Sequence, residues 1–382
     1  MRLIHLSDLH IGKRVNEFSM LEDQRYILEQ VTAIAVEQDV DGVIIAGDVY
    51  DKAVPPESAV RLFDDFLTQL TAHHLPVYLI SGNHDSADRL SFGGRILQQQ
   101  QLYFSTVFDG TLRRISLSDG HGPIHLYLMP FLKPAVVRPF FPEDGIETYE
   151  DAVRTVLAYS EIDPAARNIL VAHQFITNNG QEPERSDSEL IAVGGVDQVD
   201  VSLFDAFDYV ALGHLHGPQK IGRETVRYCG SPLKYSFSEC RQRKSVTIVT
   251  LEEKGNVAIE TVPLQPLRDL REIRGKLEDL IQPIVAASAN PDDYLRVILT
   301  DETPLYHPME QLRQVYPNVM RLETQRDGTT ETFSVTAASK VEDRSVLELF
   351  ADFYAMANGT EMTSEEIAVM ERLTDEMAGD RQ

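Results

Sequence analysis

The sequence predicts a layered α/β fold, and three observations support this prediction. Over the first two-thirds of the 382 residues, short apolar runs alternate with amphipathic stretches of helical spacing. Clusters of Asp, Asn and His fall just after the apolar runs, where open α/β sheets place their functional sites. Hydrophobic residues make up 43% of the chain, which is enough to bury a sizeable core without disulfides.

Six apolar runs and two amphipathic stretches account for most of this region. The runs expected to form buried strands are Arg2–Ser7, Gly42–Ala46, Pro76–Ser81, Ile124–Met129, Asn168–Ala172 and Tyr209–Leu212. Met20–Gln38 is expected to be helical because its apolar residues share one helical face. A second helix is expected to open with Pro55-Pro56-Glu57 and to run to about Thr71, since proline fits the first turn of a helix.

The chain after residue 265 carries none of the polar clusters. The expected order there is helix, strand, helix and strand, over Leu267–Gln282, Tyr294–Thr300, His307–Tyr316 and Asn318–Thr324. From about Val341 the chain is acidic and has two helical stretches with large apolar faces, which either pack on their own domain or dock on another protein. We therefore expect three parts: residues 1–265, 266–340 and 341–382.

The chain contains only two cysteines, Cys229 and Cys240. So few thiols, without a secretory pattern, indicate a reducing compartment and no disulfide framework. The N-terminus MRLIHLSDLHIGK has no long apolar segment, and charged residues interrupt every later apolar run. We expect neither a signal peptide nor a membrane span, and therefore a cytoplasmic protein without a membrane partner.

The formal net charge is −25 at pH 7, which bears on any nucleic-acid partner. Affinity for duplex DNA comes largely from Lys and Arg side chains on phosphates. The composition alone therefore argues weakly against DNA. If DNA is the substrate, bound metal ions or a partner subunit must supply positive potential.

Five polar clusters follow the expected strands and contain five of the 11 histidines. They are Asp8-Leu9-His10, Gly47-Asp48-Val49-Tyr50-Asp51, Gly82-Asn83-His84-Asp85, His173 and Gly213-His214-Leu215-His216. Residues two apart on an extended segment point to the same side, so an Asp-x-His or His-x-His pair can approach a metal from one direction. A turn or a core histidine would explain most of these clusters taken singly, but the ordered set predicts a metal site.

The residue types indicate which metals such a site would hold. Imidazole, carboxylate and amide oxygen together suit a borderline divalent ion such as Mn²⁺, Fe²⁺ or Zn²⁺. Sites for Mg²⁺ and Ca²⁺ rarely use so many histidines. About seven candidate ligands are too many for one catalytic ion and fit two ions that share a carboxylate and activate a water for phosphoryl displacement.

The ordered motifs resemble those of the calcineurin-like metallophosphoesterase superfamily and, within it, the SbcD family of bacterial nuclease subunits. The resemblance runs along the whole chain, through SDLHIGK, GDVYDKAVPP, SGNHDSADR, HQF, VGG at 193–195, YVALGHLHGPQ and RYCGSPLKYSFSE. It implies a layered β-sandwich flanked by helices over 1–265, a small α/β capping domain over 266–340, and docking helices over 341–382. Serine/threonine phosphatases share only the metal motifs and would have Arg and Glu where this chain has Lys52 and Asp85.

The resemblance also implies a role for each motif residue. One metal ion would be held by Asp8, His10, Asp48 and His216, and the second by Asp48, Asn83, His173 and His214. Asp48 would therefore bridge the two ions, and the usual metal of the family is manganese. No nucleotide is expected to bind, because the chain lacks a GxxxxGK[ST] motif.

The two catalytic residues implied by the family are His84 and Asp85. His84 would stabilise the transition state or protonate the leaving oxygen without binding metal. Asp85 would orient His84 and stabilise its charge. Some relatives have a second catalytic-type histidine just after the GD motif, where this chain has Asp51, so a two-histidine mechanism is not expected.

Contacts with DNA and with protein partners are expected outside the metal motifs. Candidate DNA-binding residues are Lys13, Arg14, Arg89, Lys133, Lys234 and Tyr235. The alternative for each of them is ordinary surface polarity without a role. The family resemblance implies that the terminal helices dock on an SbcC-type coiled-coil ATPase, and that the chain forms a homodimer within a heterotetramer.

The favoured hypothesis is a Mn²⁺-dependent DNA exonuclease and hairpin- or end-processing endonuclease, acting as a subunit of an ATP-driven double-strand-break repair complex. One alternative is a phosphodiesterase or phosphatase for small or protein substrates, which the extra domain and the terminal helices disfavour. The other is a catalytically silent scaffold of the same fold. The presence of Asp48, Asn83, His84 and His214 disfavours the scaffold.

Overall fold

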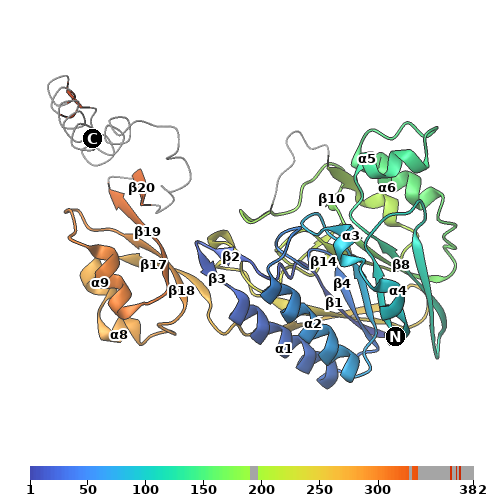
Figure 1. The fold of residues 1–382 in the computed structure, drawn as a ribbon, viewed down its shortest axis with the longest axis horizontal. Helices are drawn as coiled ribbons and strands as arrows, with labels where there is room; N and C mark the ends of the chain where they lie inside the picture. The colour runs from blue at the N-terminus through green and yellow to red at the C-terminus, as the bar shows by residue number, and fades with distance from the viewer. Residues whose placement is uncertain (190–196, 327–328, 334–361, 364–366, 368–369, 371–382) are drawn as a thin grey trace, which may run out of the picture. The chain divides into compact units, whose positions relative to one another are not determined.

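The computed structural model describes residues 1–189, 197–326 and 329–333, together with residues 362, 363, 367 and 370 (Figure 1). The chain divides into two compact units, Met1–Arg321 and Leu322–Gln382. The VGG segment at 193–195 and most of the helices predicted within 341–382 lie outside the described residues. Among those described, the Ile367 amide donates to the Thr363 carbonyl oxygen, which is the spacing of a helical bond.

A six-stranded sheet begins with the N-terminal strand. Its strand order is β16 (Val257–Pro263), β15 (Ser245–Leu251), β1 (Arg2–Leu6), β4 (Gly42–Ala46), β5 (Val77–Ile80) and β6 (Leu102–Ser105). The strands β1, β4, β5 and β6 run parallel, whereas β15 and β16 pair antiparallel at the other edge. Every residue of β4 and β5 is buried, as expected for parallel strands covered on both faces.

A second six-stranded sheet has the same plan. Its strand order is β13 (Gln219–Ile221), β14 (Arg223–Tyr228), β12 (Tyr209–Gly213), β9 (Arg167–His173), β8 (Gly122–Met129) and β7 (Arg113–Asp119). The four central strands run parallel, and β13 and β7 close the edges in the antiparallel direction. Both sheets therefore have a parallel centre, and polar motifs follow the carboxyl ends of β1, β4, β5, β9 and β12.

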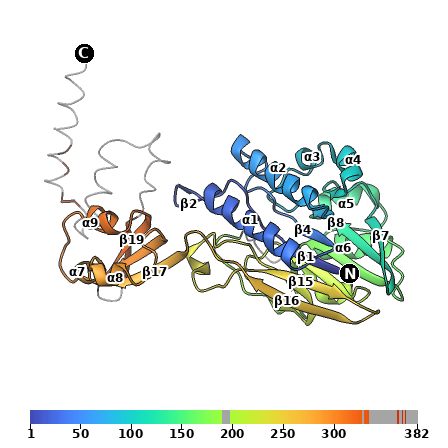
Figure 2. The same ribbon diagram turned by 90° about the horizontal axis from the view of Figure 1, so that it is seen from below.

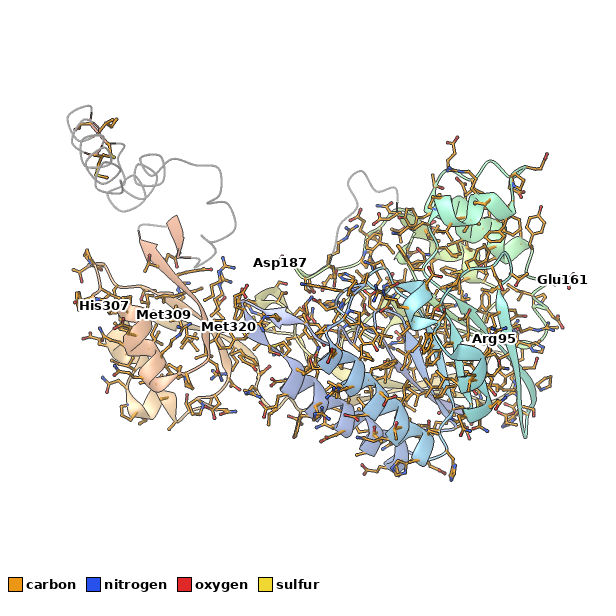
Figure 3. All side chains as sticks on the ribbon, in the orientation of Figure 1. Arg95, Glu161, Asp187, His307, Met309 and Met320 are labelled. Carbon is orange, nitrogen blue, oxygen red and sulfur yellow. The ribbon has the colours of Figure 1, made fainter. Side chains whose placement is uncertain are left out.

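The two sheets pack face to face. Ile44 and Ile80 of the first sheet share a buried apolar cluster with Leu126, Ile169 and Tyr209 of the second. The apolar side chains of this cluster fill the space between the layers. Figure 3 draws the side chains on the ribbon. The six strands predicted from the sequence are confirmed to within two residues at each end, and so is the layered α/β sandwich.

Helices cover the outer face of each sheet. On the first sheet, α1 and α2 lie side by side (Figure 2) and bury Ile27, Val31, Leu62 and Phe66. On the second, α6 buries Val153 in the cluster that contains the outer residues of β9 and β12. The bounds are α1 (Leu21–Glu37), α2 (Glu57–Ala72), α3 (Ala87–Leu90), α4 (Gly94–Leu97), α5 (Pro134–Val137) and α6 (Tyr149–Ala158), with 3₁₀ turns at Gln98–Gln100, Arg138–Phe140, Val201–Phe204 and Phe237–Glu239. Both predicted long helices are confirmed.

The helix predicted over Leu267–Gln282 is wrong. This stretch holds β17 (Leu270–Gly275), which pairs in parallel with β18 (Tyr294–Leu299), and only a short helix, α7 (Leu277–Leu280). The sequence pattern missed the strand because its pairing partner lies about two dozen residues away, and pairing overrides a weak local preference for helix. The later elements agree with prediction: α9 (Pro308–Val315) and β19 (Val319–Arg326), with α8 (Pro283–Ala286) and β20 (Thr329–Phe333) in addition. Residues Leu322–Arg326 of β19 pair antiparallel with β20.

The buried carboxylate of Asp23 joins the β17–β18 region to α1. Its two oxygens accept from the Tyr294 hydroxyl at 2.8 Å and from Arg268 Nε at 3.1 Å. A second link is the ion pair between Lys234 Nζ and Asp269, at 2.8 Å. These bonds fix the start of the small α/β region on the sandwich.

Two short strand pairs complete the described structure. β2 (Arg14–Val15) pairs with β3 (Phe18–Ser19) in antiparallel, and β10 (Phe175–Thr177) pairs with β11 (Gln198–Asp200) in parallel. Both cysteines are free thiols, Cys229 buried and Cys240 partly exposed. Within the described ranges, no helix combines the length and the apolar character needed to cross a bilayer.

We predict that Gly213→Ala destabilises the fold. A Cβ at this position would lie 1.9 Å from the Ala46 carbonyl oxygen, and backbone atoms at the junction of the two sheets cannot move aside. We expect a loss of about 1–3 kcal/mol or more in the free energy of unfolding, measured by denaturant titration. Gly120→Ala is the matched control, because nothing lies within 4 Å of its added Cβ. Its expected change is within about 0.5 kcal/mol, and equal losses in the two variants would contradict the prediction.

Candidate metal centre

The loops that follow β1 and β4 bind each other through their backbones. The Asp8 amide donates to the Gly47 carbonyl oxygen at 3.1 Å, and the His10 amide donates to the Asp48 carbonyl oxygen at 3.0 Å. This ladder continues beyond the ends of the strands, so it brings the side chains of Asp8, His10 and Asp48 to one place. The parallel pairing of β1 with β4 therefore builds the first half of the site.

Several site residues have an unusual backbone conformation. Positive φ angles occur at Asp8 (53°), His10 (43°), Asp48 (50°) and His214 (110°). For residues other than glycine, such conformations are uncommon and cost of the order of 1–3 kcal/mol each. Among the described residues, four of the twelve non-glycine residues with a positive φ follow β1, β4 and β12 in this site.

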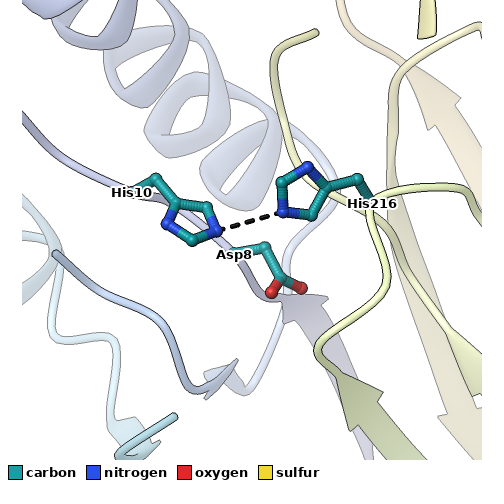
Figure 4. Close-up of side chains that lie close together, drawn as sticks. All are labelled: Asp8, His10 and His216. Carbon is teal, nitrogen blue, oxygen red and sulfur yellow. Dashed lines mark hydrogen bonds between the residues drawn. The ribbon is translucent and has the colours of Figure 1, made fainter. Parts of the chain in front are cut away.

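Asp8, His10 and His216 form the first set of donors (Figure 4). Each residue has a donor atom within 4.8 Å of the other two, and all three are buried. His10 Nε2 and His216 Nε2 face each other at 3.0 Å. The two rings come from loops more than two hundred residues apart in the sequence, so the sandwich is what brings them together.

Asn83, His173 and His214 form the second set. Asn83 Oδ1 lies 3.0 Å from His173 Nε2 and 2.9 Å from His214 Nδ1. The Ala46 carbonyl oxygen accepts a hydrogen bond from His173 Nδ1 at 2.7 Å. In a neutral His173 ring the proton is therefore on Nδ1, and the lone pair of Nε2 points at Asn83.

The carboxylate of Asp48 lies between the two sets. Its Oδ2 is 3.8 Å from His10 Nε2 and 3.4 Å from His173 Nε2. Its Oδ1 accepts from the backbone amide of His84 at 2.9 Å, which holds the carboxylate in this orientation. Asp48 Oδ2 thus lies within 4 Å of a histidine nitrogen from each donor set.

The electrostatics of the site favour a positive charge beside Asp48. Burial lowers the pKa of His214 to about 3 and lowers that of His10 well below its usual value. Burial also lowers the pKa of His173, but the carboxylate of Asp48 outweighs this effect and raises it to about 9. Burial would raise the pKa of Asp48, yet the positive charge of His173 holds it well below its usual range. Without a metal, a proton on His173 provides the charge that a cation would provide.

The donor set fits a divalent metal. Acceptor atoms of Asp48, Asn83 and neutral His173 face one another at 3.0–3.4 Å, which is unfavourable unless a cation or a proton lies among them. His10 Nδ1 is buried and has no hydrogen-bond partner among the described residues. A mixed set of imidazole, carboxylate and amide donors suits borderline ions. The seven predicted ligands thus lie in one cluster, of which five are buried and two, Asn83 and His214, are half-buried: Asp8, His10, Asp48, Asn83, His173, His214 and His216.

His84 lies at the edge of this cluster. Its ring packs edge-on against His10, with centroids 4.8 Å apart, and it is only half-buried. Its Nδ1 bonds to the carbonyl oxygen of Asp51 at 3.0 Å, which leaves Nε2 free for a substrate. The backbone of Asp51, whose side chain the family pattern does not use, thus sets the orientation of the His84 ring.

Asp85 is expected to orient His84 and to stabilise its charge, but among the described residues no hydrogen bond joins its carboxylate to the His84 ring. The carboxylate of Asp85 accepts instead from three backbone amides: Val49 at 3.2 Å, Tyr50 at 3.0 Å and Gly82 at 2.9 Å. Burial raises the pKa of Asp85 to about 6. Asp85 therefore ties the loop after β4 to the loop after β5, and acts on His84 through their backbones.

The six candidate DNA contacts divide into two groups. Arg14, Arg89 and Lys133 are exposed, and Lys13 is half-buried in an ion pair with Asp51 at 2.7 Å. Lys234 and Tyr235 are engaged within the chain. Lys234 is engaged by the Cys240 carbonyl oxygen and by Asp269, and Tyr235 is 3% exposed and donates to the Leu9 carbonyl oxygen. Their position beside a motif gave no signal of this burial.

Three arginines that the sequence analysis missed line a pocket of about 460 Å³ next to the last metal motif. They are Arg185, Arg241 and Arg243, and Gly217 and Pro218 belong to the same wall. Arg241 and Arg243 are exposed, and the Arg185 guanidinium stacks 3.9 Å from the centre of the Phe175 ring. The basic run from Arg241 to Lys244 is the sequence signal that was available for them.

Comparison with known families covers most of the chain. Residues 1–218 match the family described as calcineurin-like phosphoesterase. Residues 266–358 match the SbcD_C family, described as the type 5 capsule protein repressor C-terminal domain. The chain is 35% identical over 354 residues to a Staphylococcus epidermidis protein (strain ATCC 12228 / FDA PCI 1200) whose name makes it the D chain of the nuclease SbcCD, and the match covers 92% of each chain.

Solved structures with a similar fold are more distant. A dimetal phosphatase from Danio rerio has 11% identity and a TM-score of 0.43, over 70% of this chain and 98% of its own. The protein TT1561 of Thermus thermophilus has 13% identity and a TM-score of 0.40, over 68% of this chain and 98% of its own. Sequence identities and TM-scores this low carry no information about the reaction of this chain.

We predict that Asp48→Asn removes both metal ions, whereas His10→Ala removes one. The amide at position 48 lacks the charge that both donor sets share, and His10 belongs to one set only. Elemental analysis after gel filtration in the presence of Mn²⁺ is expected to give about two ions per chain in the parent protein. Far-UV circular dichroism checks that each variant is folded. If Asp48→Asn kept its full metal content, Asp48 would not be the bridge.

Proposed function

The chain belongs to the SbcD family of calcineurin-like phosphoesterases, and on that premise we propose that it is a metal-dependent DNA nuclease subunit. The observation that carries the proposal is the buried Asp48 carboxylate between two sets of donors, with His84 at the open edge. Two divalent cations held there would activate a water and polarise the phosphodiester. This chemistry matches hydrolysis of a phosphodiester better than any other reaction class.

The proposed role of His84 is to supply a proton to the leaving sugar oxygen. The carbonyl oxygen of Asp51 accepts from His84 Nδ1, so Nε2 is the atom that would deliver the proton. Asp85 would keep the ring in place by tying together the loops that carry Asp48 and Asn83. Catalysis by a single histidine agrees with the presence of Asp51 where some relatives have a second one.

For the metal itself we propose two Mn²⁺ ions, with Fe²⁺ or Zn²⁺ as substitutes. The proposal rests on the donor types, because four imidazoles, two carboxylates and an amide oxygen favour borderline ions over Mg²⁺ or Ca²⁺. Asp8, His10 and His216 would hold one ion, and Asn83, His173 and His214 the other, with Asp48 on both.

DNA as substrate has to be reconciled with the net charge of −25. Two divalent cations would cancel part of this charge at the point where the phosphate binds. The pocket lined by Arg185, Arg241 and Arg243 offers basic side chains beside the loop of His216, although Glu184 also lines it and Arg185 pairs with Glu182 at 3.2 Å. Guanidinium groups bind phosphate oxygens well, so the proposal places the path of the cut strand along this pocket.

The partners proposed are a second copy of the chain and an SbcC-type coiled-coil ATPase, in a heterotetramer that repairs DNA ends in the cytoplasm. Exposed apolar side chains around α2–α4 support a protein contact there: Val54, Val60, Phe92 and Ile96 are 45–87% exposed. The name of the Staphylococcus relative, a chain of SbcCD, supports the ATPase partner. In this proposal residues 1–265 form the nuclease domain, 266–340 the cap and 341–382 the docking segment.

The test of the function is a nuclease assay with Mn²⁺ on linear duplex and hairpin DNA, with and without an SbcC-type ATPase. We predict that His84→Ala lowers the rate of cleavage by about 10²–10⁴-fold, the usual contribution of a general acid, while the Mn²⁺ content stays the same. His73→Ala, at the exposed end of α2, is the matched control and is expected to retain full activity.

An aryl phosphodiester assayed in parallel separates the competing functions. Cleavage of this small substrate alone, with DNA left intact in every mixture, would contradict the nuclease and favour a small-molecule phosphodiesterase. A protein that binds Mn²⁺ and cleaves neither substrate, even with the ATPase, would contradict any catalytic role and favour a scaffold.

A further inference from the structure

Hydrogen-bonded polar side chains contact the Nδ1 side of the His216 ring. Its Nδ1 lies 2.8 Å from the Ser188 hydroxyl and 3.3 Å from Glu239 Oε1. The Ser188 hydroxyl donates its one hydrogen to the same Glu239 oxygen, at 2.6 Å. Because that hydrogen is used, Ser188 can only accept from His216, and the imidazole proton must be on Nδ1.

This arrangement decides what the other nitrogen of the ring can do. With the proton on Nδ1, the lone pair of His216 is on Nε2, which faces His10 Nε2 at 3.0 Å. A carboxylate behind a metal-binding histidine also makes its ring a stronger donor. Both effects originate at Glu239, on the side of the ring that faces away from the metal position.

Glu239 is itself held by a buried positive charge. Glu239 has no exposed surface, and its Oε2 bonds to Lys244 Nζ at 2.7 Å. Lys244 is also buried, and its ammonium donates to the His216 carbonyl oxygen at 2.9 Å and to Ser231 Oγ at 2.9 Å. Such a desolvated ion pair adds little to stability compared with apolar residues of the same size, so its presence here calls for another role.

We propose that Glu239, supported by Lys244 and Ser188, is a positioning residue that fixes the tautomer and donor strength of His216. The inference rests on the proposed assignment of His216 as a metal ligand and goes beyond it, because Glu239 is not among the seven predicted ligands. It is the last residue of the RYCGSPLKYSFSE motif, which has no assigned metal ligand. Glu239 lies on the 3₁₀ turn Phe237–Glu239, within the stretch that leads to the small α/β region.

A second buried carboxylate provides a matched comparison. Glu189 Oε1 accepts from the backbone amide of His216 at 2.7 Å, so it holds the loop and does not contact the ring. Glu189→Gln and Glu239→Gln remove one charge each, from the two sides of the same residue. Only Glu239→Gln alters the hydrogen bonding of His216 Nδ1. An amide at 239 can donate to Ser188, which then donates to His216 and drives the proton to Nε2.

The experiment is a titration of the metal-free full chain with Mn²⁺, followed by calorimetry and by the electron paramagnetic resonance signal of coupled and isolated ions. Glu239→Gln is expected to lower the affinity for one of the two Mn²⁺ ions by about 10–100-fold. At limiting Mn²⁺ its spectrum would then show an isolated ion where the parent protein shows a coupled pair. Glu189→Gln is expected to keep the coupled spectrum, and an equal loss in both variants would overturn the proposal in favour of simple loop packing.

A double-mutant cycle shows whether Glu239 acts through His216. In a His216→Ala background, Glu239→Gln is expected to have no further effect on Mn²⁺ affinity, because its target is gone. A further loss of the full 10–100-fold size would mean that Glu239 acts elsewhere. If Glu239→Gln is unstable because Lys244 is left unpaired, Ser188→Ala and the charge-free pair Glu239→Gln with Lys244→Met give the same comparison. Failure of the parent protein to bind Mn²⁺ would count against the proposed function, whereas normal binding in all variants would count against Glu239 alone.

Discussion

The carboxylate of Asp48 is the group on which the rest of the site depends. It is buried, and one of its oxygens lies within 4 Å of a histidine nitrogen on either side. A negative charge in such a place is stable only with compensation. Burial lowers the pKa of His173, but the neighbouring Asp48 carboxylate raises it to about 9, so a proton on His173 is one form of this compensation. Two metal ions would provide the compensation in a form that also performs chemistry.

The arrangement of strands and loops places the other candidate ligands around the Asp48 carboxylate. Parallel strands from both sheets end on the same side of the sandwich, and the loops after them carry Asp8, Asp48, Asn83, His173 and His214. Close approach of the layers at Gly213, where no side chain would fit, brings the second sheet within reach of the first. The apolar cluster between the sheets stabilises the fold enough to hold positive φ angles at four site residues. Around this frame, Asp85 ties two loops together, and Glu239 and Lys244 support His216 from behind.

Strands and site ligands were predictable from the sequence for a physical reason. Buried parallel strands are continuous apolar runs, and the residues that follow their carboxyl ends lie close together. The run Gly42–Ala46 therefore predicts a strand, and its position just before Asp48 predicts a site residue. Three features were not predictable. The strand Leu270–Gly275 depends on a distant partner, the turn of the Asp85 carboxylate toward backbone amides depends on how two loops meet, and the burial of Tyr235 depends on packing against Leu9 and Gln24. Each is set by contacts between segments far apart in the sequence.

The proposed position of Asp48, between two metal ions, can be tested by diffraction. Crystals grown with Mn²⁺, measured at the manganese absorption edge, would give an anomalous difference map that locates every ion without reference to activity. We predict two peaks about 3.5–4 Å apart, one on each side of the Asp48 carboxylate. One should lie beside His10 and His216, and the other beside Asn83 and His173. A single peak, or two peaks of which only one contacts Asp48, would contradict this prediction.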